Sequence, residues 1–591
     1  MAPDILSATP GGVLPRATAT EEYLMARQRV NTAVLSQYAA ALSGLIGVFI
    51  LAHWLRYIAI RFHLSQNRST LLYPFITLTR AVRRVSIREL PGFPSVGHAV
   101  LVAVYVALNA TFGFYRIDYS KPTDLAARFG WMATGNMALV VFLALKNTPL
   151  AFLTAYSYER LNVLHQISGY ATLIFAIIHG SVYSNYFLSH GRVSVLHEEV
   201  VTAAIVLGFA MFFSVLAGLL LRRFNYELFY IIHLVLFVVI VVAIGLHRPS
   251  FEQDKGLIVT VLIAALWFSD RLIRIGRLVY NSVNNEARIY ALPDGGTRIV
   301  LKKPLLRARS GKHCYVWLPK IRAFETHPFT IVAGSPMELI INTYSGFTRD
   351  LHNYAAKNSG ASLKVSVEGP YGTNPDPMQF DKVVLVAGGS GATFTFGLTA
   401  DMLGRMTQDS KQQVDFIWAV KGHDNLAWFT EHLNHLRTHV HAPKFALKLH
   451  LTRLPAASPT NTTGHRTSSV TSDESLNSSP TSPLEKSVES PQFGVSMSPG
   501  TLRGDSEKDE EMRQMELPSA MTSSSDLPII HGRPDTEMLI KEAIGSVGKD
   551  QRILVAACGP ASLLKVVRNT TASCIQVDGP AVELHCEQFG W

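Results

Sequence analysis

Hydrophobic and polar residues separate along this chain into long apolar segments in the first half and short, mixed segments in the second. Each long segment is close to the ~20 residues that a helix needs to cross the hydrocarbon core of a bilayer. The predicted spans are 34–55, 97–114, 128–146, 161–182, 199–221, 226–247 and 256–273. This pattern predicts a seven-helix α-helical transmembrane domain over 34–275. It follows a polar, extracytoplasmic N-terminus at 1–33 that lacks the pattern of a cleavable signal peptide.

Two of the predicted spans carry histidines at equal intervals. His165 and His179 lie on one span, His233 and His247 on another, and each pair is fourteen residues apart. Fourteen residues return a side chain to within about 40° of the same helix face, displaced by ~21 Å. Two such helices side by side would place one histidine pair near each leaflet. Imidazole is a common axial ligand of haem iron, so the pattern predicts two bis-histidine haems.

The alternative for a histidine in an apolar helix is a hydrogen-bonded core residue. Ionisable groups are rare inside a membrane, however, and are functional candidates by default. Four histidines with one spacing repeated on two helices therefore favour metal ligation over a structural role.

Charge predicts the orientation of these spans. The connection after the first span carries seven arginines between residues 56 and 88, against the single acid Glu89. By the positive-inside rule this connection faces the cytoplasm, as does everything after residue 273. The inner haem pair is then His165 with His233, and the outer pair is His179 with His247. The formal net charge of +10 fits this topology, and we do not expect binding to nucleic acid.

Composition agrees with a chain that is half membrane and half soluble. Hydrophobic residues make up 48% of the chain and the mean hydropathy is +0.19, which is high for a soluble protein and low for one wholly in the membrane. Four cysteines lie in the second half without metal-site spacing, and we expect no disulfide framework. They are Cys314, Cys558, Cys574 and Cys586.

The second half begins with short, alternating segments bounded by turn residues. Segments 287–291, 297–302 and 313–318 alternate between apolar and polar positions, which predicts an antiparallel β-barrel domain over 283–376. From residue 381 the pattern changes to α/β. Residues 382–387 form a nearly continuous apolar run, as expected of a buried parallel strand.

A glycine-rich turn follows that strand and precedes a predicted helix. The sequence Gly388-Gly389-Ser390-Gly391 in this position would offer backbone N–H groups to a phosphate, although a simple tight turn is the alternative. The next strand ends at Lys421, where an acid would usually bind the ribose of NAD. A lysine suits a 2′-phosphate and favours NADPH, with Asp424 close enough to keep NAD as an alternative.

A low-complexity insert interrupts the α/β domain predicted over 381–591. Residues 456–527 are rich in Ser, Thr and Pro and cannot bury a core, so we expect them to be disordered. The insert contains Ser-Pro pairs that suit proline-directed phosphorylation, and a neutral spacer is an equal alternative.

Further motifs occur in a fixed order along the second half. They are His327-Pro328-Phe329-Thr330, Gly346-Phe347-Thr348, Gly369-Pro370-Tyr371-Gly372, Gly532-Arg533-Pro534-Asp535, Cys558-Gly559-Pro560 and a terminal Phe589-Gly590-Trp591. With the two histidine helices and the glycine turn, the chain resembles the fungal ferric/cupric reductases over about 95–455 and 527–591. These are relatives of the NADPH oxidases that join a haem membrane domain to a ferredoxin-reductase-like module.

The resemblance implies a multi-domain membrane protein with a FAD-binding β-barrel and a Rossmann-like NADPH domain. The implied FAD residues are His327, Pro328, Phe329, Thr330, Gly346 and Thr348, with Trp591 as the terminal aromatic that stacks on flavin. The implied NADPH residues are Gly388, Gly389, Ser390, Gly391, Lys421, Arg533 (near the 2′-phosphate), Cys558, Gly559 and Pro560. No catalytic residue is expected beyond the electron-transfer cofactors.

The implied activity is transfer of electrons from cytosolic NADPH through FAD and two b-type haems to ferric chelates outside, with cupric chelates as a second acceptor. In the family this supports iron uptake, with an iron permease or multicopper oxidase as partner, and the default location is the plasma membrane, with the vacuolar membrane as alternative. A superoxide-producing NADPH oxidase is the alternative within enzymes. A seven-helix transporter or receptor with a nucleotide-sensing domain is the alternative outside them.

Overall fold

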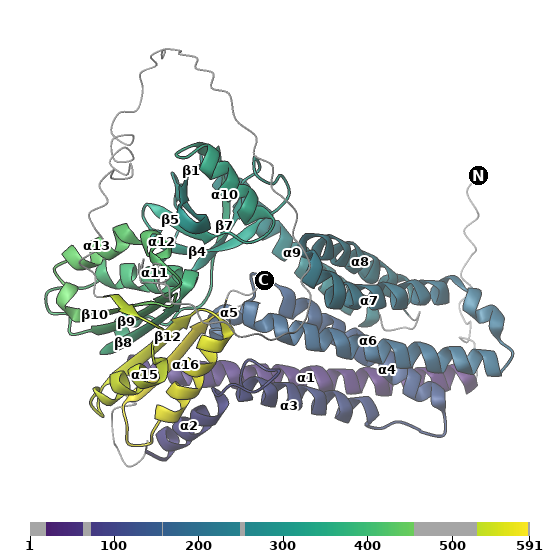
Figure 1. The fold of residues 1–591 in the computed structure, drawn as a ribbon. Helices are drawn as coiled ribbons and strands as arrows, with labels where there is room; N and C mark the ends of the chain where they lie inside the picture. Colours follow the sequence, from purple (N-terminus) through teal and green to yellow (C-terminus); the bar gives the residue numbers. More distant parts are fainter. Residues whose placement is uncertain (1–18, 63–72, 157, 249–254, 454–528, 589–591) are drawn as a thin grey trace, which may run out of the picture. The chain divides into compact units, whose positions relative to one another are not determined.

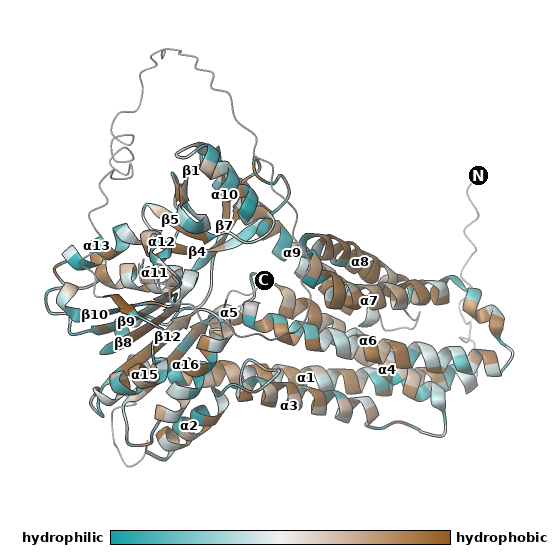
Figure 2. Cartoon of the chain, viewed as in Figure 1, coloured by the Kyte–Doolittle hydropathy of each residue, from teal (hydrophilic) through white to brown (hydrophobic). Residues whose placement is uncertain are grey.

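The computed structural model describes residues 19–62, 73–156, 158–248, 255–453 and 529–588. The predicted insert at 456–527 and Trp591 lie outside the described residues. Within them, seven helices are long and apolar enough to cross a membrane, as predicted. They are α1 (Ala19–Arg61), α3 (Val96–Phe114), α4 (Pro122–Ala144), α6 (Tyr158–Ser189), α7 (Glu199–Phe224), α8 (Tyr226–Leu246) and α9 (Lys255–Ser282) (Figure 1). Figure 2 shows α7 and α8 as predominantly hydrophobic along their lengths.

The first helix begins earlier than its hydrophobicity predicts. α1 starts at Ala19, so part of the stretch predicted as a polar N-terminal segment is helical. Polar side chains of this part pair with α4: the indole N–H of Trp131 donates to Gln28 at 3.1 Å, and Arg128 Nε donates to Asn31 at 2.8 Å. These partners satisfy groups that would otherwise be costly to bury, which explains why a polar stretch continues the helix.

Two helices in the first half of the chain were not predicted. α2 (Tyr73–Ser86) lies in the arginine-rich connection between α1 and α3, and α5 (Leu150–Thr154) lies between α4 and α6. The last membrane helix, α9, continues to Ser282, beyond the predicted end at 273.

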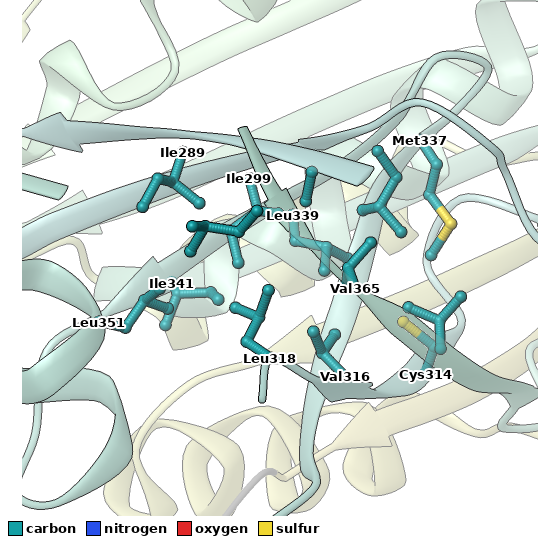
Figure 3. Packing of buried hydrophobic residues seen from close by; sticks show 14 of the residues in the cluster. Ile289, Ile299, Cys314, Val316, Leu318, Met337, Leu339, Ile341, Leu351 and Val365 are labelled. Carbon is teal, nitrogen blue, oxygen red and sulfur yellow. The ribbon is translucent and has the colours of Figure 1, made fainter. Parts of the chain in front are cut away.

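Seven strands form the antiparallel sheet of the predicted barrel. They are β1 (Glu286–Leu292), β2 (Gly296–Leu301), β3 (His313–Trp317), β4 (His327–Gly334), β5 (Met337–Asn342), β6 (Ser362–Lys364) and β7 (Ser366–Tyr371). Their order is β6-β1-β2-β5-β4-β3-β7. The two edge strands, β6 and β7, are separated only by Val365, so the sheet curls until its edges meet. Alternate side chains fill its interior, including Ile289, Val316 and Leu339 (Figure 3).

A parallel six-stranded sheet follows, as predicted. Its strands are β8 (Lys382–Gly388), β9 (Gln413–Val420), β10 (Phe445–Leu451), β11 (Ile529–His531), β12 (Arg552–Cys558) and β13 (Ala581–Glu587), in the order β11-β10-β9-β8-β12-β13. The helices of this domain are α11 (Ala392–Leu403), α12 (His423–Ala427), α13 (Thr430–Thr438), α15 (Thr536–Gly545) and α16 (Ala561–Cys574). The chain order reverses between β8 and β12, and ligands of such sheets bind at the carboxyl edge of this switch point.

Candidate functional site

The four predicted histidines form two pairs, in which His165 of α6 lies beside His233 of α8, and His179 of α6 lies beside His247 at the C-terminal cap of α8. The ring centroids of His165 and His233 lie 6.3 Å apart, and those of His179 and His247 lie 6.0 Å apart. Two metal–imidazole bonds of about 2 Å, together with the ring radii, separate the centroids of two axial ligands by about 6 Å. Each pair therefore has the separation expected of imidazoles on opposite sides of one iron.

The two histidines of α6 are oriented by backbone carbonyls of α4. Nδ1 of His165 donates to the carbonyl of Val140 at 2.9 Å, and Nδ1 of His179 donates to that of Ala126 at 2.7 Å. A carbonyl can only accept, so the ring proton lies on Nδ1 and the lone pair of Nε2 is left for a metal. Gly130 makes room for one of these rings, because a Cβ there would lie 2.6 Å from Nδ1 of His179.

The two histidines of α8 are oriented by α7. Nδ1 of His247 donates to the carbonyl of Val200 at 3.0 Å. His233 differs from the other three, since its Nδ1 lies 2.9 Å from the hydroxyl oxygen of the buried Ser214. A hydroxyl can donate or accept, so iron on Nε2 of His233 would require Ser214 to act as the acceptor. All four rings thus have a hydrogen-bond partner at Nδ1, as metal-bound histidines usually do. Sequence reasoning missed these partners.

The predicted FAD residues lie on β4 and at the start of α10 (Phe347–Lys357). His327 stacks on Phe347, with 4.3 Å between ring centroids, and thereby joins the two motifs. Its Nε2 also lies 3.0 Å from the carboxylate of Glu325. Gly346, with a φ of 71°, precedes the helix, and Thr348 lies in its first turn. The free N–H groups of this turn suit an anionic group such as a pyrophosphate. Pro328, Phe329 and Thr330 continue β4 in register with β3.

The glycine turn and the Cys-Gly-Pro motif meet at the carboxyl edge of adjacent parallel strands, β8 and β12. A Cβ on Gly391 would lie 2.3 Å from the carbonyl oxygen of Cys558, and one on Gly559 would lie 3.0 Å from the backbone nitrogen of Gly388. The two loops pack backbone against backbone, so these positions require glycine. Gly389 has a φ of 57°, and its carbonyl accepts a hydrogen bond from the indole of Trp418 at 3.1 Å.

Cys558 is buried beneath these loops, with 3% of its surface exposed. Burial raises the pKa of its thiol well above the ordinary value, and the nearby Glu587 and Cys586 add to this shift. The thiol is therefore protonated near neutral pH. Cys558 therefore lines the site as an uncharged side chain and is not suited to act as a nucleophile.

Three cationic side chains follow neighbouring strands at the same sheet edge. Lys421 follows β9, Arg453 follows β10 and Arg533 follows β11. The backbone N–H of Arg453 donates to the carbonyl of Lys421 at 3.1 Å, and all three residues are exposed. Sequence reasoning identified Lys421 and Arg533 but missed Arg453, which it placed as the last residue of a strand. An anionic group bound at this sheet edge would therefore have three cationic side chains near it.

A buried ion pair connects the last membrane helix to the barrel. Arg274 of α9 contacts Glu368 of β7 through two hydrogen bonds, and the hydroxyl of Tyr371 also donates to Glu368. Lys146 lies with its ammonium 3.2 Å from the ring centroid of Tyr315. Burial alone would raise the pKa of Glu368, but Arg274 and Lys146 outweigh burial and hold this pKa below its ordinary value.

Three family models match the chain. "Ferric reductase like transmembrane component" matches 129–244, "FAD-binding domain" matches 281–375 and "Ferric reductase NAD binding domain" matches 380–572. These ranges overlap the three predicted domains, whose boundaries stay predictions.

Several curated fungal proteins are similar in sequence to most of this chain. "Ferric reductase transmembrane component 4" of Saccharomyces cerevisiae is 25% identical over 509 residues, which are 81% of this chain and 65% of that protein. "Ferric/cupric reductase transmembrane component 1" of Candida albicans is 24% identical over 616 residues, 97% of this chain and 74% of that protein. Over most of its length this chain is similar to the fungal ferric/cupric reductases. It spans 65% of the length of the first of these relatives.

A third similar protein, from Aspergillus oryzae, is named "Probable cell surface ferric reductase kap2". It is 26% identical over 422 residues, 62% of this chain and 55% of that protein. Among solved structures, a ferredoxin NADP+ reductase from Neisseria gonorrhoeae with bound FAD and NADP aligns with 51% of this chain and 97% of its own. The identity is 13% and the TM-score is 0.30.

The comparisons and the fold agree on the architecture of this chain. It is an integral membrane protein with seven apolar helices, a FAD-binding domain and an NAD-binding domain. The matched membrane region contains His165, His179 and His233 and ends three residues before His247.

Proposed function

We propose that this chain is a transmembrane metalloreductase. In this proposal electrons pass from cytosolic NADPH through FAD and two b-type haems to ferric chelates on the opposite side, and cupric chelates are a second acceptor. The physiological role is iron uptake. The proposal rests on the two histidine pairs, whose ring centroids lie 6.3 Å and 6.0 Å apart. Three of these four histidines lie in the region that matches the ferric reductase transmembrane model. When bound, FAD accepts a hydride and passes single electrons to haem iron.

In this proposal the membrane domain holds two irons by four imidazoles. His165 and His233 hold one, and His179 and His247 hold the other. The carbonyls at Nδ1 of His165, His179 and His247 keep Nε2 of these rings unprotonated. At His233 the Ser214 hydroxyl would do the same by acting as the acceptor. Gly130 keeps a Cβ out of the space that the His179 ring occupies.

The nucleotide preference follows from the cationic sheet edge. Lys421, Arg453 and Arg533 would surround the 2′-phosphate that distinguishes NADPH from NADH, and arginine suits two-point contact with phosphate. The glycine turn from Gly388 to Gly391 would hold the pyrophosphate by backbone N–H groups. The loop from Cys558 to Pro560 would lie beside the nicotinamide.

For FAD, we propose that β4 and α10 act together. His327 to Thr330 would hold the isoalloxazine and ribityl region, and Gly346 and Thr348 would lie near the pyrophosphate. The His327–Phe347 stack supports this assignment, because it places the strand motif directly beside the helix N-terminus.

We propose the plasma membrane as the location, with the FAD and NADPH domains in the cytoplasm. The arginine-rich connection between α1 and α3 supports this orientation. The name of the Aspergillus oryzae relative, a cell surface ferric reductase, supports the location.

The proposal is tested by difference spectroscopy of the purified full-length chain in lipid, with ferric citrate reduction followed in the same sample. We expect NADPH to reduce two b-type haems per chain and to drive iron reduction that superoxide dismutase does not inhibit. Dismutase-sensitive activity with oxygen consumption would favour the superoxide-producing oxidase. A purified chain without haem absorbance would overturn the proposal and favour a transporter or receptor.

A further inference from the structure

The helix α2 has an exposed apolar stripe. The exposed fractions are 69% for Phe75, 62% for Leu78, 56% for Val82 and 55% for Val85. Their spacing of three, four and three residues places them within about 80° of one helix face. No residue of α2 is buried in the chain. A continuous apolar stripe of this kind on a soluble surface would mark an interaction site.

Other residues of α2 bind the NAD-binding domain. Arg80 donates from Nη1 to the carbonyl of Gly579 at 2.9 Å, and Arg83 donates to that of Val582 at 3.0 Å. Arg83 also pairs with the carboxylate of Glu583 at 3.3 Å. Arg80 and Arg83 lie away from the stripe by the same helical periodicity, so the two faces of α2 have different partners.

The position of α2 in the chain identifies the partner of the apolar face. α2 connects two candidate membrane spans, α1 and α3. Its end lies against the beginning of α3, because a Cβ on Gly97 would come within 3.1 Å of Ser86. The stripe is thus held at the boundary where the α3 span begins. Arg88 is exposed nearby and suits lipid phosphates.

We propose that α2 is an interfacial helix. Its stripe of Phe75, Leu78, Val82 and Val85 lies in the lipid leaflet on the side of the FAD- and NAD-binding domains. Its arginines Arg80 and Arg83 hold the NAD-binding domain against that membrane surface. Interfacial helices bury their apolar face about 5–10 Å into the headgroup and acyl boundary, and carry basic residues on the polar face, as α2 does. The proposal rests on the membrane spans and not on the redox function.

The test measures the depth of single side chains with nitroxide labels in the full-length chain. The chain is placed in nanodiscs of phosphatidylcholine and phosphatidylserine. All labelled variants also carry Cys574→Ser, which removes the partly exposed cysteine. The other three cysteines are buried and should not react with the label. Labels are attached to Leu78→Cys or Val82→Cys on the stripe, and to Arg84→Cys, an exposed control on another face. Size-exclusion chromatography checks that each variant is folded.

We expect the labels at positions 78 and 82 to collide several-fold more with oxygen, which partitions into lipid, than with a water-soluble nickel complex. The label at position 84 should show the reverse. Equal access of the nickel complex to all three labels would show that the stripe faces water and would overturn the proposal. Protection of positions 78 and 82 from both reagents would also overturn it, because a protein partner or a second copy would then cover the stripe.

Discussion

Arg274, in the last membrane-spanning helix, and Glu368, in β7 of the barrel, form a two-point ion pair with N–O distances of 2.7 and 3.1 Å. Only 11% and 3% of the two side chains are exposed. The pair is supported by two neighbouring contacts, in which Asn281 donates to the carbonyl of Val367 at 2.8 Å and Ser366 donates to that of Leu278. The membrane helix therefore continues directly into the edge of the FAD-binding domain.

Replacing Glu368→Gln should destabilise this connection. The change leaves Arg274 buried without a countercharge, and loss of one partner of a buried pair costs roughly 3 kcal/mol or more. We expect a lower melting temperature in a thermal unfolding experiment on the full-length chain in detergent. The control is Glu286→Gln, where an exposed carboxylate accepts a hydrogen bond from Ser362 and a small effect is expected. Equal melting temperatures for the two variants would contradict the prediction.

The same pair predicts an acid dependence. Because the pKa of Glu368 in the folded chain is below its ordinary value of 4.5, the carboxylate contributes stability at higher pH. This contribution should be lost as the pH falls from about 4.5 through the lowered folded value. Thermal unfolding across this pH range should show a steeper loss of stability for the unmodified chain than for Glu368→Gln. Parallel curves for the two chains would show that Glu368 does not titrate as described.

Gly130→Ala should remove one of the two proposed iron sites and spare the other. A Cβ at this position would lie 2.6 Å from Nδ1 and 2.7 Å from Cε1 of His179, so the ring must move away from its carbonyl partner. Haem content, measured as pyridine haemochrome per polypeptide, should fall from two to about one. The control is Gly44→Ala, where a Cβ meets nothing within 4 Å. Full haem content in the Gly130 variant would mean that His179 is not a ligand in this geometry.

Arg453→Ala should lower the preference for NADPH over NADH. Loss of a hydrogen bond between charged partners costs about 1.5–3 kcal/mol, which corresponds to a roughly 10- to 100-fold rise in the KM for NADPH. The KM for NADH should stay unchanged, because NADH lacks the 2′-phosphate. Steady-state kinetics with both nucleotides measures this. Lys549→Ala is the matched control, since Lys549 is exposed before β12 and lies at the opposite sheet edge. An equal change for both nucleotides would assign Arg453 a structural role.

The four cysteines should differ in reactivity. Cys574 is partly exposed, whereas Cys314, Cys558 and Cys586 are buried and burial raises their pKa values. The thiolate is the reactive form, so iodoacetamide near neutral pH should modify Cys574 first in the native chain. Peptide mass spectrometry before and after unfolding measures the order. Early modification of Cys558 would show that the loop over it opens.

Much of the fold was predictable because its elements have simple periodicities. Seven apolar runs of bilayer length predicted seven spans, and alternating or continuous apolar runs predicted the strands of the two sheets. The equal histidine spacing predicted two pairs, because 14 residues nearly complete whole helical turns. The predicted orientation of the spans then indicated which rings would meet. The structure places both pairs accordingly.

The features that were missed depend on contacts between distant segments. The early start of α1 depends on polar partners in α4, such as Arg128 for Asn31. Arg453 joins Lys421 and Arg533 only because β10 lies between β9 and β11, and strand order is not visible in the sequence. The carbonyls of Ala126, Val140 and Val200 are backbone atoms, which have no sequence signature.

The two α6 histidines, His165 and His179, belong to one uninterrupted helix of 32 residues. Inserting a single residue between them would rotate one ring by about 100° relative to the other and lengthen their separation by about 1.5 Å. At least one ring would then leave its carbonyl on α4 and its partner on α8. Amino-acid replacements between the two histidines should be widely tolerated if they stay apolar and helical, whereas insertions and deletions there should not. The interval constrains the number of residues more strictly than their identity.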